Sequence, residues 1–231
     1  MQIDFKSFTK KFIKDKDTFP FGMRFYDGVM GSGKSLTMAK DCYDICQQYN
    51  DVLVISNLHF KIDIGAQEII YFQTTDELIS ALVYSQGRKH TWVLIDEALT
   101  YFAENGGIDP ALMNKITQSR SCRRFICLGS QKFKRINNRL RDFSLETVQC
   151  RNIGRIQFNA IRDDTRLHFD KQEMDFVGPV KEYQIFKRNI ELFNLYDTFE
   201  GVKLSTSVHS GSLVMPAQTN SITFDKSFFK R

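Results

Sequence analysis

The sequence predicts an α/β fold with a mostly parallel central sheet that is flanked by helices. From residue 22 onward, short apolar strands alternate with helical segments, which is the pattern of a parallel sheet with helices on its faces. A glycine-rich stretch stands between the first strand and the first helix of that pattern. The chain has 231 residues, 42% hydrophobic and 26% charged. This composition is typical of a soluble globular protein and excludes collagen-like, coiled-coil and wholly disordered classes.

The expected elements of the sheet follow one another in a regular order. A helix is predicted at 34–48, because its apolar residues recur on one face. Thr74 and Glu77 have the spacing of a capping box ahead of a helix that ends near Gly87, and Asp-Pro at 109–110 opens a further helix toward residue 118. Strands are expected at 23–27, 52–56, 92–95 and 125–129.

After residue 144 the alternation stops. Segments 145–151 and 155–162, joined by a turn that contains Gly154, predict a C-terminal β-hairpin that extends or caps the sheet. A further strand is expected at 183–186 and a short segment at 192–198.

The two ends of the chain differ from this domain. Phe5, Phe8 and Phe12 form one apolar helical face with lysines around it, which predicts a short helix on the protein's own core or, alternatively, an interfacial anchor or a partner-docking helix. Positions 203 to 227 hold nine Ser or Thr residues, which suggests an extended or disordered arm. We therefore divide the chain into an amphipathic extension, a main domain and a Ser/Thr-rich arm, at 1–21, 22–202 and 203–231.

Basic residues are concentrated in one stretch of the chain. The net charge of +5 is too small to indicate nucleic-acid binding by itself. Between Lys115 and Arg141, however, nine basic residues occur without a single Asp or Glu. They are Lys115, Arg120, Arg123, Arg124, Lys132, Lys134, Arg135, Arg139 and Arg141.

The cysteines indicate a reducing compartment. The five Cys are an odd number without CxxC spacing, and the four His lie far from them, so we expect reduced thiols in a cytosol-like compartment and no Cys/His metal site. The sequence has no run of 18 apolar residues, so no transmembrane span is expected.

The glycine-rich stretch is a full GxxxxGK[ST] phosphate-binding loop, or P-loop. Its glycines let backbone N–H groups surround phosphate oxygens, Lys34 reaches the β and γ phosphates, and the Ser35 hydroxyl completes the shell of a Mg²⁺ ion. The alternative, a chance glycine-rich turn, is disfavoured by the flanking strand and helix. The expected nucleotide-binding residues are Gly28, Val29, Met30, Gly31, Ser32, Gly33, Lys34, Ser35 and Leu36.

Two acids follow the apolar strand that begins at Trp92. Ligands of open α/β sheets bind at the carboxyl ends of the strands, so we expect Asp96 to hold Mg²⁺ together with Ser35, and Glu97 to polarise an attacking water. An acid pair favours hydrolysis over transfer to a bound acceptor. The alternative is a strand end followed by a helix cap.

The strand at 125–129 also ends in a polar residue, Gln131, which we expect to contact the γ-phosphate or its attacking water. The alternative is an ordinary loop residue. From the basic stretch, Arg139 and Arg141, with Arg120 next, are candidates for an arginine finger that acts on a neighbouring subunit. The stretch can instead line a channel for a phosphate backbone, or form a solvated basic face.

Six segments together resemble the zonula occludens toxin-like family, the assembly ATPases of filamentous phages. This family lies within the HerA/FtsK group of pumping ATPases, which also contains genome-packaging ATPases of membrane-containing icosahedral viruses. Tyr196, Asp197, Thr198 and the Gln-tipped strand make the resemblance, over roughly residues 23–202, more specific than the P-loop alone. The segments are GVMGSGKSLTMAK, SNLHF, WVLIDEALTYF, ITQSRSCRRFICLGSQ, INNRLRDF and NLYDTFEG.

The resemblance implies a RecA-like P-loop NTPase of the additional-strand, catalytic-Glu type. It also implies ATP as the nucleotide, a sensor role for Gln131, an arginine acting in trans, and a homo-oligomeric ring, expected to be a hexamer, around single- or double-stranded DNA. Members usually carry a transmembrane helix after the ATPase domain. Without that span, we expect a motor that packages a viral genome, located in the host cytoplasm, at the packaging vertex of the virion, or peripherally at a membrane. Residues 1–20 would then contact a capsid or a membrane surface.

Three alternatives remain beside genome packaging. The same engine can drive virion assembly and extrusion. A nucleotide-switch scaffold without sustained turnover is disfavoured by Glu97, since a pure switch has little need of a second acid. A small-molecule kinase is disfavoured because no phosphate-acceptor site is evident in the remaining sequence.

Overall fold

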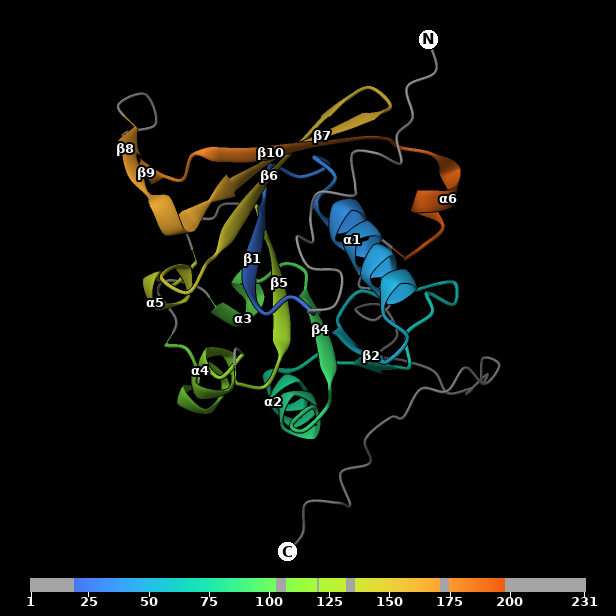
Figure 1. Ribbon diagram of the computed structural model, residues 1–231, viewed down its shortest axis with the longest axis vertical. Helices are drawn as coiled ribbons and strands as arrows, with labels where there is room; N and C mark the ends of the chain where they lie inside the picture. The colour runs from blue at the N-terminus through green and yellow to red at the C-terminus, as the bar shows by residue number, and fades with distance from the viewer. Residues whose placement is uncertain (1–18, 103–106, 120, 132–135, 171–174, 198–231) are drawn as a thin grey trace, which may run out of the picture.

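The computed structural model describes residues 19–102, 107–119, 121–131, 136–170 and 175–197 (Figure 1). The predicted N-terminal helix and the Ser/Thr-rich arm lie outside these residues, as does Arg120.

The described chain builds an eight-stranded sheet in the order β10-β7-β6-β1-β5-β4-β2-β3. The six strands from β6 to β3 run parallel to their neighbours, and β7 and β10 add an antiparallel extension at the β6 edge. A small separate sheet pairs β8 with β9. The bounds are β1 Gly22–Asp27, β2 Val52–Ser56, β3 Glu68–Tyr71, β4 His90–Ile95, β5 Arg124–Ser130, β6 Glu146–Ile153, β7 Ile156–Asp163, β8 His168–Asp170, β9 Asp175–Val177 and β10 Val180–Lys187.

Helices cover both faces of the sheet (Figure 1). One apolar cluster contains residues of α1 and α6, and another contains residues of α2, α3, α4 and α5. Adjacent residues of one strand enter different clusters, as Phe25 and Tyr26 of β1 do, because successive side chains point to opposite faces of a sheet. The helices are α1 Lys34–Gln48, α2 Thr75–Tyr84, α3 Leu99–Phe102, α4 Pro110–Thr117, α5 Asn138–Arg141 and α6 Ile190–Phe193.

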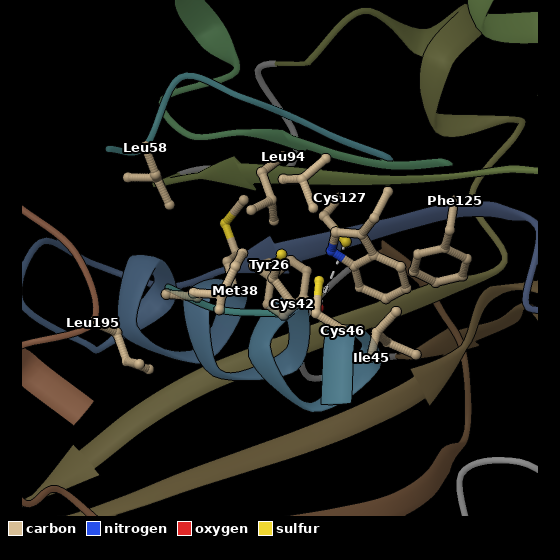
Figure 2. Packing of buried hydrophobic residues seen from close by; sticks show 14 of the residues in the cluster. Tyr26, Met38, Cys42, Ile45, Cys46, Leu58, Leu94, Phe125, Cys127 and Leu195 are labelled. Atoms are coloured by element: carbon tan, nitrogen blue, oxygen red, sulfur yellow. Dashed lines mark hydrogen bonds between the residues drawn. The ribbon is translucent and has the colours of Figure 1, made fainter. Parts of the chain in front are cut away.

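The first cluster packs α1 onto the sheet. Cys42 and Cys46 of α1 point toward Tyr26 and Cys127 of the neighbouring strands β1 and β5 (Figure 2). The cysteines are free thiols, and burial raises the pKa of the Cys127 thiol above its ordinary value. They therefore act as small apolar side chains that let the P-loop helix lie close to the sheet.

Within the described residues, the strands and helices predicted for the mostly parallel sheet and its flanking helices are confirmed, with small changes at their ends. Helix α2 has the expected capping box, in which Thr74 and Glu77 bond each other's backbone N–H groups. Gly154, with φ +58°, occupies the two-residue turn between β6 and β7. The segment expected at 192–198 begins as helix α6, and Tyr196 pairs with Phe60 in an isolated bridge.

Short elements were not predicted. Strand β3 has four residues at a sheet edge, and α3 and α5 are single turns of four residues, so none carries enough periodicity to be recognised in sequence.

A buried ion pair joins β1 to β6 and also contacts α1 and β10. Arg24 of β1 contacts Glu146 of β6 at 2.5 Å and Asp41 of α1 at 3.4 Å. Lys181 of β10 also donates to Glu146. Burial alone would raise the pKa of Glu146, but the charges of Arg24 and Lys181 hold this pKa below its usual range.

Candidate functional site

The P-loop connects β1 to α1 with a backbone that requires glycine. Gly28, Gly31 and Gly33 have φ of +152°, +75° and +91°, which only glycine adopts readily. At Gly28 a Cβ atom would lie 2.6 Å from the carbonyl oxygen of Cys150, so no larger residue fits there. Between these glycines, Val29 and Met30 are 74% and 80% exposed at the tip of the loop.

Lys34 is folded back into this loop. Its buried ammonium donates to the carbonyl oxygens of Gly28 at 2.9 Å and Val29 at 3.2 Å. The first hydrogen bond of α1 runs from Thr37 to Gly33, so the N–H groups of Lys34, Ser35 and Leu36 have no acceptor inside the helix. The Leu36 side chain is buried in the core, which leaves only its backbone to face a ligand. The loop thus offers a cation and a helix N-terminus to an anion.

The structure brings the two predicted metal ligands together. Ser35 Oγ donates to Asp96 Oδ2 at 2.5 Å, and the N–H of Glu97 donates to Asp96 Oδ1 at 3.0 Å. Burial raises the pKa of Asp96, and the charge of Glu97 adds to this effect, although both hydrogen bonds oppose it. A hydroxyl and a carboxylate are the hard oxygen donors that Mg²⁺ prefers, so the residues present fit this ion.

Asn57, which sequence reasoning missed, holds Asp96 in place. It follows β2, the strand next to β4, and its carboxamide donates to the Asp96 carbonyl at 2.8 Å and accepts from the Asp96 N–H at 2.7 Å. Behind Asp96, a Cβ atom on Gly129 would lie 2.5 Å from Asp96 Oδ1. A polar residue directly after an apolar strand was the signal that pointed to Gln131, and it applies equally to Asn57.

Glu97 and Gln131 meet at the tips of β4 and β5. Gln131 Nε2 donates to Glu97 Oε1 at 3.3 Å, as expected if the two act on one ligand. Glu97 has φ +50°, a left-handed conformation that is unfavourable for a non-glycine residue. Such strain is concentrated at functional sites, where the surroundings hold it in place. Here the N–H of Ala98 donates to the Gly129 carbonyl at 2.7 Å.

The members of the basic stretch that the structure describes do not all face solvent. Arg124, one of the nine basic residues for which a finger, a channel lining or a solvated face was expected, has none of these roles, because its side chain is buried. Arg124 is fully buried at the start of β5, the opposite end from Gln131, and it donates to Ser85 Oγ and to the carbonyls of Leu82 and Lys115. It therefore satisfies one carbonyl in the last turn of α2 and one in the last turn of α4, which is a structural role.

The finger candidates Arg139 and Arg141 lie on the short helix α5. Arg139 is exposed and lines a groove with Pro110, Met113 and Asn137. Arg141 donates to Asn138, which lies in the same helix turn. Arg120 is outside the described residues.

The segment around Tyr196 lies beside the loop that follows β2. The Asp197 N–H donates to the His59 carbonyl, and the Lys61 N–H donates to the Leu195 carbonyl, both at 2.9 Å. Burial raises the pKa of Tyr196 to about 12, and the negative charge of Asp96 contributes to this rise. The tyrosine is therefore close enough to the acid strand to be influenced by Asp96.

These features define the class of the protein. The P-loop strand β1 and the acid strand β4 are separated by β5, and Glu97 directly follows Asp96, so the fold is that of an additional-strand P-loop NTPase. The family model described as zonular occludens toxin (Zot) matches residues 23–200. The chain belongs to this family, as its sequence motifs indicated.

Two solved structures share this fold. The N-terminal domain of zonular occludens toxin from Neisseria meningitidis is 18% identical with a TM-score of 0.52, covering 76% of this chain and 98% of that one. The genome packaging NTPase B204 from Sulfolobus turreted icosahedral virus 2, in complex with ATP-gammaS, is 12% identical with a TM-score of 0.50, covering 69% of this chain and 97% of that one. A search of curated proteins found no match. Within the described residues, no helix has the length and apolar character needed to span a membrane.

Proposed function

We propose that the protein is a Mg²⁺-dependent ATPase. The observation that carries this proposal is the Ser35–Asp96 contact beside the Glu97–Gln131 pair, at the carboxyl ends of adjacent strands. Lys34 and the P-loop N–H groups bind the phosphates. Ser35 and Asp96 would hold Mg²⁺, which supplies positive charge to the phosphate oxygens when bound.

Within this proposal, Glu97 carries the catalytic base function. Its carboxylate is exposed at the end of β4, where it can orient a water molecule and accept its proton. Gln131, through its hydrogen bond to Glu97 Oε1, holds that carboxylate in position and responds when the γ-phosphate leaves.

ATP hydrolysis by purified protein tests this assignment. Glu97→Gln should bind ATP normally and lose turnover by about 100-fold or more, which is the scale of general-base catalysis. Lys34→Ala is the matched control, because it should lose nucleotide binding itself. Turnover in Glu97→Gln that equals the wild-type rate would contradict the base role.

We further propose that hydrolysis drives DNA through a homo-oligomeric ring, expected to be a hexamer, during packaging of a viral genome. A cationic surface outside the basic stretch supports a polyanionic partner. At the turn end of the β6–β7 hairpin, the side chains of Arg151, Arg155 and Lys187 are exposed. The backbone N–H of Arg188 donates to the Arg155 carbonyl at 2.7 Å, which places the end of β10 beside this turn. No acidic residue occurs at 150–159 or 183–190. These positive charges would attract a phosphate backbone.

DNA stimulation of turnover tests the motor. We expect single- or double-stranded DNA to raise the ATPase rate, and the stimulation to weaken with salt. Replacing Arg151, Arg155 and Lys187 with Ala should remove most of it. Replacing Lys115, Arg123 and Arg139 removes the same charge and is the matched set for the basic stretch. Turnover that is indifferent to DNA in a monomeric protein would instead support a nucleotide switch.

Virion assembly and extrusion is the second candidate function, favoured by membership of the Zot family. The two motors differ in the DNA that they move. Stimulation by single-stranded DNA alone would favour extrusion of a filamentous virion, whereas stimulation by double-stranded DNA would favour packaging.

A further inference from the structure

Gln157, in the antiparallel extension of the sheet, contacts the P-loop directly. This side chain of β7 is fully buried, and its Nε2 donates to the carbonyl oxygen of Ser32 at 2.8 Å. The two residues are 125 positions apart in the chain. No motif at position 157 indicated a role, and the hairpin had been expected only to extend or cap the sheet.

This hydrogen bond fixes the orientation of one peptide unit. In a trans peptide, the C=O of one residue and the N–H of the next point in opposite directions. Because Gln157 holds the Ser32 carbonyl toward β7, the N–H of Gly33 points away from β7. In a P-loop the backbone N–H groups are what phosphate oxygens bind, so their directions determine affinity.

The side chain of Gln157 also lies in close contact with Gly33. A Cβ atom at Gly33 would be 2.1 Å from Gln157 Oε1 and 2.7 Å from its Cδ. Gln157 Oε1 and Ser32 Oγ are both buried without a hydrogen-bond partner. Packing that leaves two buried polar atoms unpaired is unfavourable, so this arrangement has a cost that a purely structural contact would avoid.

A hydrogen-bond network prevents the carboxamide of Gln157 from turning over. Its Nε2 donates a second bond to Asn159 Oδ1 at 2.8 Å, and Asn159 in turn donates to Thr37 Oγ1 of α1 at 3.2 Å and to Gln184 Oε1 of β10 at 2.9 Å. Thr37 Oγ1 donates to the Gly33 carbonyl at 2.8 Å. The network therefore holds Nε2 of Gln157 toward the Ser32 carbonyl, and it also bonds the Gly33 carbonyl through Thr37.

We infer that Gln157 is a positioning residue of the P-loop, which holds the Ser32–Gly33 peptide so that the Gly33 N–H faces a bound phosphate. The inference rests on the proposed nucleotide binding. It assigns to β7, a strand outside the parallel core of the sheet, a direct part in nucleotide affinity.

Steady-state kinetics and binding of ATPγS test this inference. Gln157→Leu removes the donor, and Gln157→Glu removes it with almost no change of shape. A lost N–H bond to a phosphate weakens ground-state and transition-state binding alike, so KM and the Kd for ATPγS should rise about tenfold or more while kcat changes little. A residue that only supported folding would lower the active fraction, and with it the apparent kcat, without changing KM.

Gln184→Leu is the matched control. It loses hydrogen bonds of the same network but does not touch the P-loop, so KM should stay at the wild-type value. Asn159→Ser frees the Gln157 carboxamide to rotate, so it should also raise KM. This variant replaces the Gln157 variants in the test where they do not fold. Unchanged KM and Kd in the folded variants, with binding intact in the wild type, would overturn the inference. A wild-type protein that binds no ATPγS would instead refute the proposed function.

Discussion

Ser35 and Asp96, 61 residues apart in the chain, share a hydrogen bond of 2.5 Å between Oγ and Oδ2. The contact exists because α1 begins beside the end of β1, while β5 sets β4 at a fixed spacing from that strand. The Ser35 hydroxyl and the Glu97 N–H are the two donors that stabilise this carboxylate. The hydrogen bond therefore keeps the two proposed Mg²⁺ ligands next to each other.

Asp96→Asn should make the nucleotide-free protein more stable and the enzyme inactive. Burial raises the pKa of Asp96, which means that the folded state disfavours its ionised form. A neutral amide avoids this penalty, so the Tm without nucleotide should rise by a few degrees. ATP turnover should fall by about 100-fold or more, the scale of losing one electrostatic stabiliser. Calorimetry together with an ATPase assay checks both effects, and a lower Tm would contradict the argument.

The phosphate-binding half of this site was predictable from sequence because its residues are contiguous. Residues 28–35 are one continuous segment, the P-loop and the start of α1. Asp96 and Gln131 were found because parallel strands end at one edge of the sheet. Asn57 directly follows an apolar strand, so the signal that pointed to Gln131 could have found it as well. Gln157 lies inside β7 and reaches the P-loop across 125 residues, and no local pattern distinguishes it from other polar strand residues. Arg124 was misjudged because a count of charges contains no information on burial.

Gln131→Ala should reduce turnover while leaving ATP affinity close to the wild-type value. Gln131 contacts Glu97 rather than the P-loop, so its loss leaves the phosphate cradle intact but frees the base to rotate. We expect kcat to fall about tenfold, within the range for a misplaced catalytic group. If both act on one step, combining Gln131→Ala with Glu97→Gln should add little further loss. Fully additive losses in this double-mutant cycle would show that the pair does not act together.

Gly33→Ala and Gly31→Ala should differ in their cost to stability. Both glycines have positive φ, but a Cβ at Gly31 meets nothing within 4 Å, whereas one at Gly33 overlaps Gln157. Gly31→Ala should therefore lose about 1 kcal/mol from backbone strain alone. Gly33→Ala adds a displaced buried side chain and should lose ~3 kcal/mol or more. Urea unfolding of the nucleotide-free protein measures both, and equal losses would contradict the close contact with Gln157.

Glu146→Gln should destabilise the protein at neutral pH and much less in acid. The pKa of Glu146 is lowered in the folded state, so its stabilising contribution is present above the ordinary glutamate pKa of about 4.3 and is lost as the pH falls through the lower folded value. At pH 7 the variant leaves Arg24 buried with one carboxylate fewer, at a cost of about 3 kcal/mol. Unfolding free energies measured from pH 7 to pH 3 should therefore converge. Parallel curves would mean that the ion pair does not set this pH dependence.

Arg141→Ala subunits should inhibit wild-type subunits when the two are mixed. An arginine that acts on a neighbouring subunit removes activity from a site whose own residues are intact, so turnover should fall more steeply than the fraction of wild-type protein. Arg139 lies in the same helix turn of α5 and is exposed, so Arg139→Ala in the same mixtures shows which of the two acts in trans. Lys34→Ala is the reference, because it disables only its own nucleotide site. A strictly proportional fall for both arginine variants would exclude them and leave Arg120 as the remaining candidate.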